Sequence, residues 1–178
     1  MASSKTERQE YRLVNKEKGY EIRYYPSATL ATVHSTSSSY RTLAYSGFRK
    51  LAGFIFGGNE TNTKIAMTSP VHMDINDTAS SMSFVLPSSY SGKEIPRPND
   101  PGVIVEQSDS EYIAAIRFGG YASNRGIKKY AEKLRKLLEK NGIDYYGNFR
   151  YLGYNPPYQF IGRRNEVIVS VNWSETNM

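Results

Sequence analysis

The sequence predicts a single α+β domain in which an antiparallel sheet of about eight strands, curving towards a distorted barrel, carries two flanking helices. Two observations lead to this prediction. Short segments of alternating apolar and polar residues are separated by turns, and two longer segments repeat their apolar residues at helical spacing. These elements follow one another in the order strand, strand, helix, strand, strand, and that order occurs twice.

The first half begins with a polar stretch, residues 1–9, which we expect to be a flexible leader. A helix is predicted over Ser38–Phe56, because Ala44, Phe48, Leu51, Ala52 and Ile55 recur at helical spacing. Ser38 or Ser39 is available as its cap, and a pair of glycines follows it. The predicted strands of this half are Glu10–Val14, Tyr20–Tyr25, Ala28–His34, Lys64–Asp74 and Ser81–Leu86.

The strand KIAMTSPVHMD, Lys64–Asp74, carries the most distinctive pattern in the chain. Alternation places Met67 and Met73 on one face and His72 on the other. Such a strand lines either an ordinary core or a soft apolar pocket, because methionine adapts to irregular shapes.

The second half follows a proline-rich connection, Pro87–Gly102. Its helix is the clearest in the chain, Ser123–Asn141, with an apolar stripe that includes Leu134 and Leu138 and a basic opposite face. The predicted strands are Val103–Gln107, Tyr112–Phe118, Phe149–Tyr154 and Glu166–Trp173.

The two halves match when the chain is shifted so that Gly102 lies on Gly19 and Leu134 lies on Leu51. We interpret residues 10–86 and 102–173 as pseudo-repeats of a ββαββ unit within one domain, residues 10–178.

Bulk composition narrows the class of protein. The chain has 178 residues, 39% apolar and 22% charged, which is typical of a soluble globular domain. No apolar run reaches the length of a membrane span and no signal sequence is evident, so we expect no membrane insertion and a cytoplasmic location. The net charge is +6, but the basic residues form no nucleic-acid motif, and we expect no nucleic-acid partner. We also expect a monomer.

Catalytic and metal-binding patterns are missing from the sequence. With no cysteine and two histidines, a protein-built metal site is not predicted. The motifs of zinc proteases, serine hydrolases and nucleotide-binding loops do not occur, and the aspartates are scattered through turns. The sequence therefore predicts no catalytic residues.

Four separated motifs resemble the SOUL/haem-binding-protein family. They are GYEIRYYPSATLATV from Gly19, GGN with KIAMTSPV from Gly57, FGGYA from Phe118, and GYNPPYQFIGRRNEV from Gly153. The resemblance runs from Glu10 to about Val171. It implies a barrel of pseudo-duplicated halves with two helices, and an apolar groove that binds haem or a related tetrapyrrole.

The resemblance also implies candidate binding residues. Haem requires cations near its propionates, and five basic residues lie in or beside the motifs: Arg23, Arg49, Lys64, Arg163 and Arg164. For any single one of them, the simpler explanation is a surface charge or a partner of Glu21, Glu60 or Glu166. Tyr24 occupies the position at which some family members carry an iron-ligating histidine, so a strong axial ligand is not expected. The predicted site residues are Tyr24, Arg49, Met67, His72, Met73 and Arg163.

The sequence therefore predicts reversible binding of haem or another tetrapyrrole by a carrier, buffer or sensor without catalysis of its own. Two alternatives remain. The duplication also resembles the effector-binding domains of bacterial transcription regulators, for which a buried carboxylate in the groove is the distinguishing feature. A tetrapyrrole-processing enzyme such as a dechelatase is the other.

Overall fold

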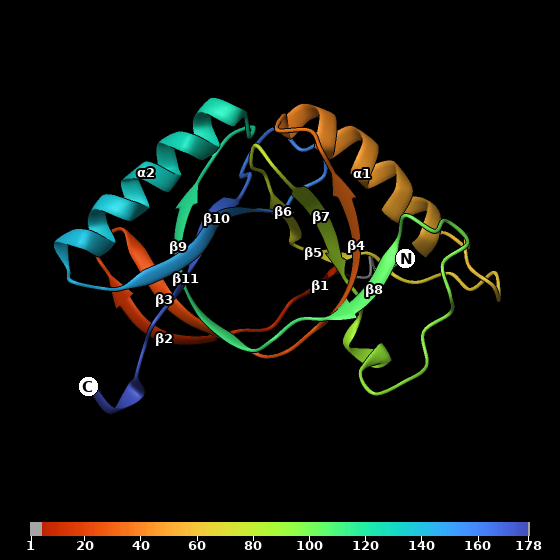
Figure 1. Cartoon of the computed structure of the whole chain (residues 1–178), viewed down its shortest axis with the longest axis horizontal. Helices are drawn as coiled ribbons and strands as arrows, with labels where there is room; N and C mark the ends of the chain where they lie inside the picture. The colour runs from red at the N-terminus through yellow and green to blue at the C-terminus, as the bar shows by residue number, and fades with distance from the viewer. Residues whose placement is uncertain (1–4, 178) are drawn as a thin grey trace. The chain divides into compact units, whose positions relative to one another are not determined.

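A computed structural model describes residues 5–177, and the chain forms two compact units of nearly equal length (Figure 1). One unit comprises residues 5–9 and 28–108. The other comprises residues 10–27 and 109–177. Each unit is therefore assembled from two separate stretches of chain.

The first unit contains a four-stranded antiparallel sheet in the order β6-β7-β4-β8 and the helix α1. Two short strands, β1 and β5, pair in parallel beside it. The apolar pairs Ala31↔Phe84 and Val33↔Met82 join β4 to β7, and all four side chains are buried. The elements are β1 (Glu7–Arg8), β4 (Thr29–Ser35), α1 (Tyr40–Ile55), β5 (Thr68–Ser69), β6 (Val71–Asp74), β7 (Ser80–Val85), the 3-10 turn Ser88–Tyr90 and β8 (Ile104–Gln107).

The second unit contains a five-stranded antiparallel sheet in the order β2-β3-β9-β11-β10 and the helix α2. Strand β11 is buried along its whole length, since it lies between β9 and β10 and beneath α2. The elements are β2 (Arg12–Glu17), β3 (Tyr20–Tyr25), β9 (Glu111–Phe118), α2 (Asn124–Lys140), β10 (Tyr145–Gly153), β11 (Asn165–Val171) and the 3-10 turn Glu175–Asn177.

Helix α2 forms as predicted and covers β9 and β11. The Ser123 hydroxyl caps its start by accepting a hydrogen bond from the Gly126 amide at 3.1 Å. Leu134 and Leu138 are fully buried, and the Tyr130 ring stacks on Phe118 with centroids 4.4 Å apart. The helix is therefore held by its apolar stripe, while its lysines face solvent.

Helix α1 also forms, and Leu51, Ala52 and Ile55 of its predicted stripe are buried, but the rest of the buried stripe differs from the prediction. Leu43, Gly47, Leu51 and Phe54 face β4 and β7, whereas Phe48 is 43% exposed. The prediction that Phe48 belongs to the core stripe is wrong, because the small residue Gly47 allows the helix to approach Met82 closely on the neighbouring face.

The α+β class, the two helices and the antiparallel strand pairing are confirmed. The structure retains the order β3, β4, α1, β6, β7 in the first half and β8, β9, α2, β10, β11 in the second. Closure into a barrel, the duplication and the single-domain organisation stay predictions.

Two local predictions need correction. Of the predicted leader, residues 1–4 lie outside the described residues, but Glu7–Arg8 pair with β5 and the Gln9 amide donates to the Ser69 carbonyl at 2.8 Å. The predicted strand Lys64–Asp74 is two short strands on either side of Pro70, because proline has no amide hydrogen to donate to a ladder.

Over residues 5–177, neither helix is long and apolar enough to cross a membrane.

Candidate functional site

The outer surface of α1 combines aromatic and cationic side chains in one stripe. Positions three and four residues apart lie on the same side of a helix, so this stripe is continuous. Tyr45 is 74% exposed, Phe48 43% and the C-cap residue Phe56 65%, and two exposed arginines lie among them. We call this surface the aromatic–cationic face of α1; it comprises Arg41, Tyr45, Phe48, Arg49 and Phe56.

The local sequence explains why this face exists. Ser39 begins the helix by accepting a hydrogen bond from the Thr42 amide. The buried stripe, which includes Leu51 and Phe54, faces the sheet, and Tyr45 and Phe56 lie outside that stripe. Phe48 is anchored at its inner edge, since its ring meets Phe84 of β7 edge-on at 5.4 Å between centroids.

Gly53 leaves the helix backbone without a side chain next to the aromatic–cationic face. It lies one turn after Arg49 and one turn before Phe56, and it is exposed. The position that a Cβ would occupy at Gly53 has no other heavy atom within 4 Å, so a flat ligand can approach the helix backbone there.

The two arginines of the face are not neutralised. Across residues 5–177, the ion pairs involve other cationic side chains, and neither Arg41 nor Arg49 has a carboxylate partner. An unpaired, exposed guanidinium can bind a ligand carboxylate with two parallel hydrogen bonds. The face therefore offers apolar rings and anion-binding groups together.

Among the five side chains of this face, the Tyr45 phenol is the group of a type that can ligate iron. None of its five side chains is an imidazole, a thiolate or a thioether. In the part of the chain that the structure describes, no group of three or more histidine, aspartate or glutamate side chains is arranged to hold a metal ion.

Of the six predicted site residues, Arg49 lies on the aromatic–cationic face, and three others lie on or beside the short strands β5 and β6. Met73 is buried, 3% exposed, and pairs with Met82 of β7. His72, on the opposite side of β6, is half-buried, with its Nε2 2.7 Å from the Gln9 side-chain oxygen. Met67 is half-buried just before β5.

The remaining two predicted residues belong to the second unit. Tyr24 lies on β3, with its ring 5.1 Å from that of Tyr112. Arg163 lies in the loop between β10 and β11, where it donates to the carbonyl oxygens of Pro156 and Gln159 at 2.7 and 3.0 Å. The structure thus engages Arg163 with its own loop.

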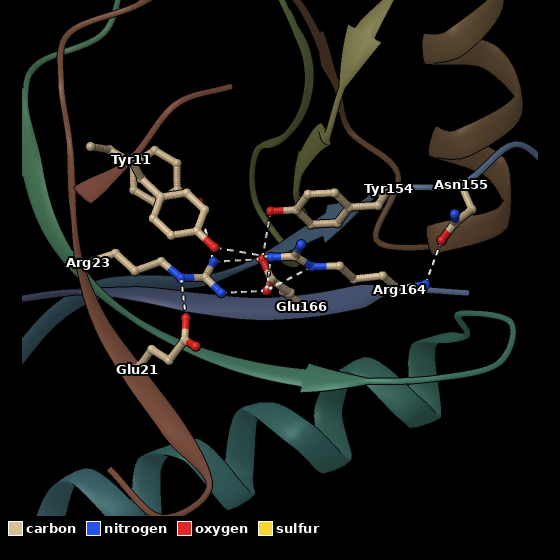
Figure 2. A network of polar contacts seen from close by, with 8 residues as sticks. Tyr11, Glu21, Arg23, Tyr154, Asn155, Arg164 and Glu166 are labelled. Carbon is tan, nitrogen blue, oxygen red and sulfur yellow. Dashed lines mark hydrogen bonds and ion pairs between the residues drawn. The ribbon is translucent and has the colours of Figure 1, made fainter. Parts of the chain in front are cut away.

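Two further arginines considered for propionate binding, Arg23 and Arg164, form a buried charge network instead (Figure 2). Arg23 of β3 donates two parallel hydrogen bonds to Glu166 of β11, at 2.8 and 2.6 Å, and a third to Glu21 at 2.9 Å. Arg164 donates to the same Glu166 carboxylate at 3.0 Å. The alternative interpretation, that these arginines partner Glu21 and Glu166, is confirmed.

Tyrosines complete the network. Tyr154 donates from its hydroxyl to Glu166 at 2.7 Å, while the Tyr11 ring lies 4.2 Å from the Arg23 guanidinium carbon (Figure 2). Burial by itself would raise the pKa of Glu166, but the hydrogen bonds and charge of Arg23 outweigh burial and lower it. Burial raises the pKa of Tyr154, which therefore remains a neutral donor.

The network holds β3 to β11 across the intervening β9, and its two arginines balance its two glutamates. It leaves no uncompensated charge for a ligand. The sequence indicated Glu21 and Glu166 as possible partners of these arginines, but it could not show that they form one network, because Arg23 and Glu166 are 143 positions apart. Tyr45, Phe56 and Arg41 were also missed, although their helical spacing from Phe48 and Arg49 was a visible signal.

Comparison with solved structures first defines the class of fold. The C-terminal domain of EcmrR aligns with a TM-score of 0.67 at 8% identity, covering 87% of this chain and 98% of that one. A structure described as a hydrolase from Listeria innocua aligns with a TM-score of 0.56 at 8% identity, covering 88% and 93%. At such low identity these likenesses concern the fold alone.

Sequence comparison identifies the family. Residues 6–170 match the family described as SOUL heme-binding protein. Heme-binding protein 1 of Mus musculus is 30% identical over 156 residues, covering 83% of this chain and 82% of the relative. Heme-binding protein 1 of Xenopus laevis is 31% identical over 156 residues, covering 83% and 81%. The chain belongs to the SOUL heme-binding protein family.

Proposed function

We propose that this protein binds haem or a related tetrapyrrole reversibly on the aromatic–cationic face of α1, and that it acts as a carrier, buffer or sensor without catalysis of its own. The observation that carries the proposal is that three exposed aromatic rings and two unpaired arginines share one helical stripe. Relatives named heme-binding proteins support the ligand class.

The chemistry of the ligand fits this surface. A porphyrin is a flat apolar ring system with carboxylates at one edge. Tyr45 and Phe56 offer rings against which it can stack, and Gly53 leaves room for its plane close to the helix backbone. Arg41 and Arg49 lie where they can bind its carboxylates. Binding through these groups requires no bond from the protein to iron.

Arg49 is the sequence-predicted residue that we retain in the proposed site. Tyr24, Met67, His72, Met73 and Arg163 stay predictions. Met73 is the hardest to include, because a ligand reaches it only if the core around it opens.

A cation-binding effector module is less well supported. Its distinguishing feature is a buried carboxylate, and Glu166 is buried, but Arg23 and Arg164 already neutralise it. A tetrapyrrole-processing enzyme has no supporting observation among the described residues.

Haem titration followed by the Soret absorbance tests the proposal. The wild-type chain should show saturable binding at micromolar haem. The double variant Y45A/R49A should bind about 10- to 100-fold more weakly, since it loses one stacking contact and one charged pair. The control R117A/Y146A removes an exposed arginine and an exposed tyrosine from β9 and β10 and should bind like wild type.

Equal affinities for Y45A/R49A and the control would place the ligand elsewhere. Tyr24→Phe and His72→Ala should leave the Soret maximum of the complex unchanged. A shifted maximum in either variant would identify an iron ligand and favour the sequence-predicted residues over the face of α1. Loss of iron from haem over time would mark a processing enzyme.

A further inference from the structure

The loop between β10 and β11 ends in an apolar tip that no part of the proposed function uses. Tyr158, Phe160 and Ile161 are 77%, 80% and 88% exposed, the highest fractions among the large apolar side chains of the described residues. Single exposed apolar residues are ordinary, but three within four positions form a patch that indicates an interaction surface.

The backbone of this tip is held by hydrogen bonds from within the second unit. Arg163 donates to the carbonyl oxygens of Pro156 and Gln159, and the Gln159 side chain donates to the carbonyl of Ile161 at 3.0 Å. The Tyr121 hydroxyl donates to the Pro157 carbonyl at 2.9 Å. These bonds satisfy carbonyl groups of the loop internally, so the apolar side chains are presented without a further ordering step.

Basic side chains lie next to the base of the loop. Tyr121, which contacts the loop, is two residues before Ser123, the N-cap of α2, and Figure 1 shows the β10–β11 loop passing the start of this helix. The first turns of α2 carry the exposed residues Arg125, Lys128 and Lys129, and no acidic residue lies in the first turn. The helix that begins next to the base of the loop is therefore positively charged in its first turns.

This combination matches an anionic bilayer surface. Apolar side chains at a loop tip can enter the headgroup region, and basic residues around them are attracted to acidic lipids. A stable protein partner requires about 1,000 Å² of complementary surface, far more than three side chains supply. The expectation of no membrane insertion came from the lack of a spanning segment, and so short a tip escapes a hydropathy search.

We propose that the tip Tyr158–Ile161 anchors the protein peripherally to membranes that contain acidic lipids, with Arg125, Lys128 and Lys129 contacting the headgroups. The tip enters the interface without crossing it. This inference stands independently of haem binding.

Flotation of the full-length, haem-free chain with lipid vesicles tests the inference. Wild type should float with vesicles of phosphatidylcholine and phosphatidylserine, less with phosphatidylcholine alone, and less as salt rises. F160S/I161S should lose at least about tenfold in affinity, because it removes the apolar contacts. R125Q/K128Q/K129Q should lose the preference for phosphatidylserine.

The matched control is L13S/Y146S, which removes two apolar side chains that are 49% and 51% exposed on β2 and β10. It should float like wild type, and circular dichroism should show all variants folded. Failure of wild type to float, or equal loss in both double variants, would overturn the inference. The inference would also be overturned if F160S/I161S lost haem binding but still floated with vesicles. It would likewise be overturned if wild type self-associated at high concentration and F160S/I161S did not.

Discussion

Glu166 lies at the centre of the buried charge network of the second unit. Its carboxylate is fully buried and accepts hydrogen bonds from Arg23, Arg164 and Tyr154. A buried ion pair does not by itself guarantee stability, but removing one partner leaves an uncompensated charge in the core.

The variant Glu166→Gln should therefore be strongly destabilised. The amide is nearly isosteric but neutral, so the buried Arg23 guanidinium loses its counter-charge, and we expect a loss of about 3–5 kcal/mol in the free energy of unfolding. Urea denaturation measures this quantity. Glu132→Gln is the control, because Glu132 pairs with Arg135 on the exposed surface of α2 and should change stability by less than about 1 kcal/mol. Similar losses of unfolding free energy in both variants would show that the buried network contributes no more to stability than an exposed ion pair.

The same carboxylate should make stability sensitive to acid. The folded-state pKa of Glu166 lies below its ordinary value of 4.5, since Arg23 and Arg164 outweigh the effect of burial. Its contribution to stability is present above pH 4.5 and is lost as the pH falls through the folded-state pKa. Unfolding free energies measured from neutral to acidic pH should fall more steeply for wild type than for Glu166→Gln. Parallel curves would contradict the prediction.

At the scale of elements, α1 carries two glycines with opposite surroundings. A Cβ at Gly47 would lie 3.1 Å from the Met82 sulfur and 3.2 Å from the Met82 Cβ, whereas one at Gly53 would have no neighbour within 4 Å. Gly47 permits close packing of α1 on the sheet. Gly53 serves no packing role, which is why its surroundings are available to a ligand.

Alanine substitution should separate these roles. Gly53→Ala should raise the free energy of unfolding by about 0.5–1 kcal/mol through helix propensity alone. Gly47→Ala gains the same propensity but crowds Met82, which costs about 1–3 kcal/mol, so the net change should be destabilising. Urea denaturation compares the two. If haem binds as proposed, Gly53→Ala should also weaken haem binding. Stabilisation by both substitutions would contradict the close packing of α1 on Met82 at Gly47.

At the scale of the whole molecule, the chain interleaves its two units. The hairpin β2–β3 is contributed by residues 10–27 to a sheet whose other strands come from residues 109–177. Neither predicted repeat, residues 10–86 or 102–173, contains a complete sheet of that unit. The ion pair between Arg12 and Glu175, at 2.5 Å, brings the two stretches of the second unit together near its chain end.

This interleaving predicts which fragment folds. A permuted fragment, residues 109–177 joined by a short flexible linker to residues 10–27, should unfold cooperatively in urea, because it contains all five strands and α2. Residues 102–178 alone should not, since they lack β3, in which Ile22 and Tyr25 are buried. Circular dichroism checks both. Cooperative unfolding of the shorter fragment would show that β2 and β3 are dispensable.

The sequence by itself determined the local structure and the family. Both helices, a serine cap at Ser38 or Ser39 for the first of them, and the sites of most strands could be read from it, because apolar periodicity and capping depend on residues within four positions of one another. The four family motifs are short continuous stretches that occur along the chain in the order found in the family. They could therefore be recognised in the sequence, and the comparison confirms the family that they indicated.

Only the tertiary structure decided which surfaces and charges are available. Whether Phe48 or Phe54 faces solvent depends on how closely α1 packs at Gly47, and whether Arg23 is free depends on a partner in a distant strand. Such outcomes follow from strand register and packing between residues far apart in the chain, which local pattern does not encode. The exposure of the proposed ligand face on α1 and of the tip of the β10–β11 loop is therefore a property of the folded chain, even though the helical spacing of the face is present in the sequence.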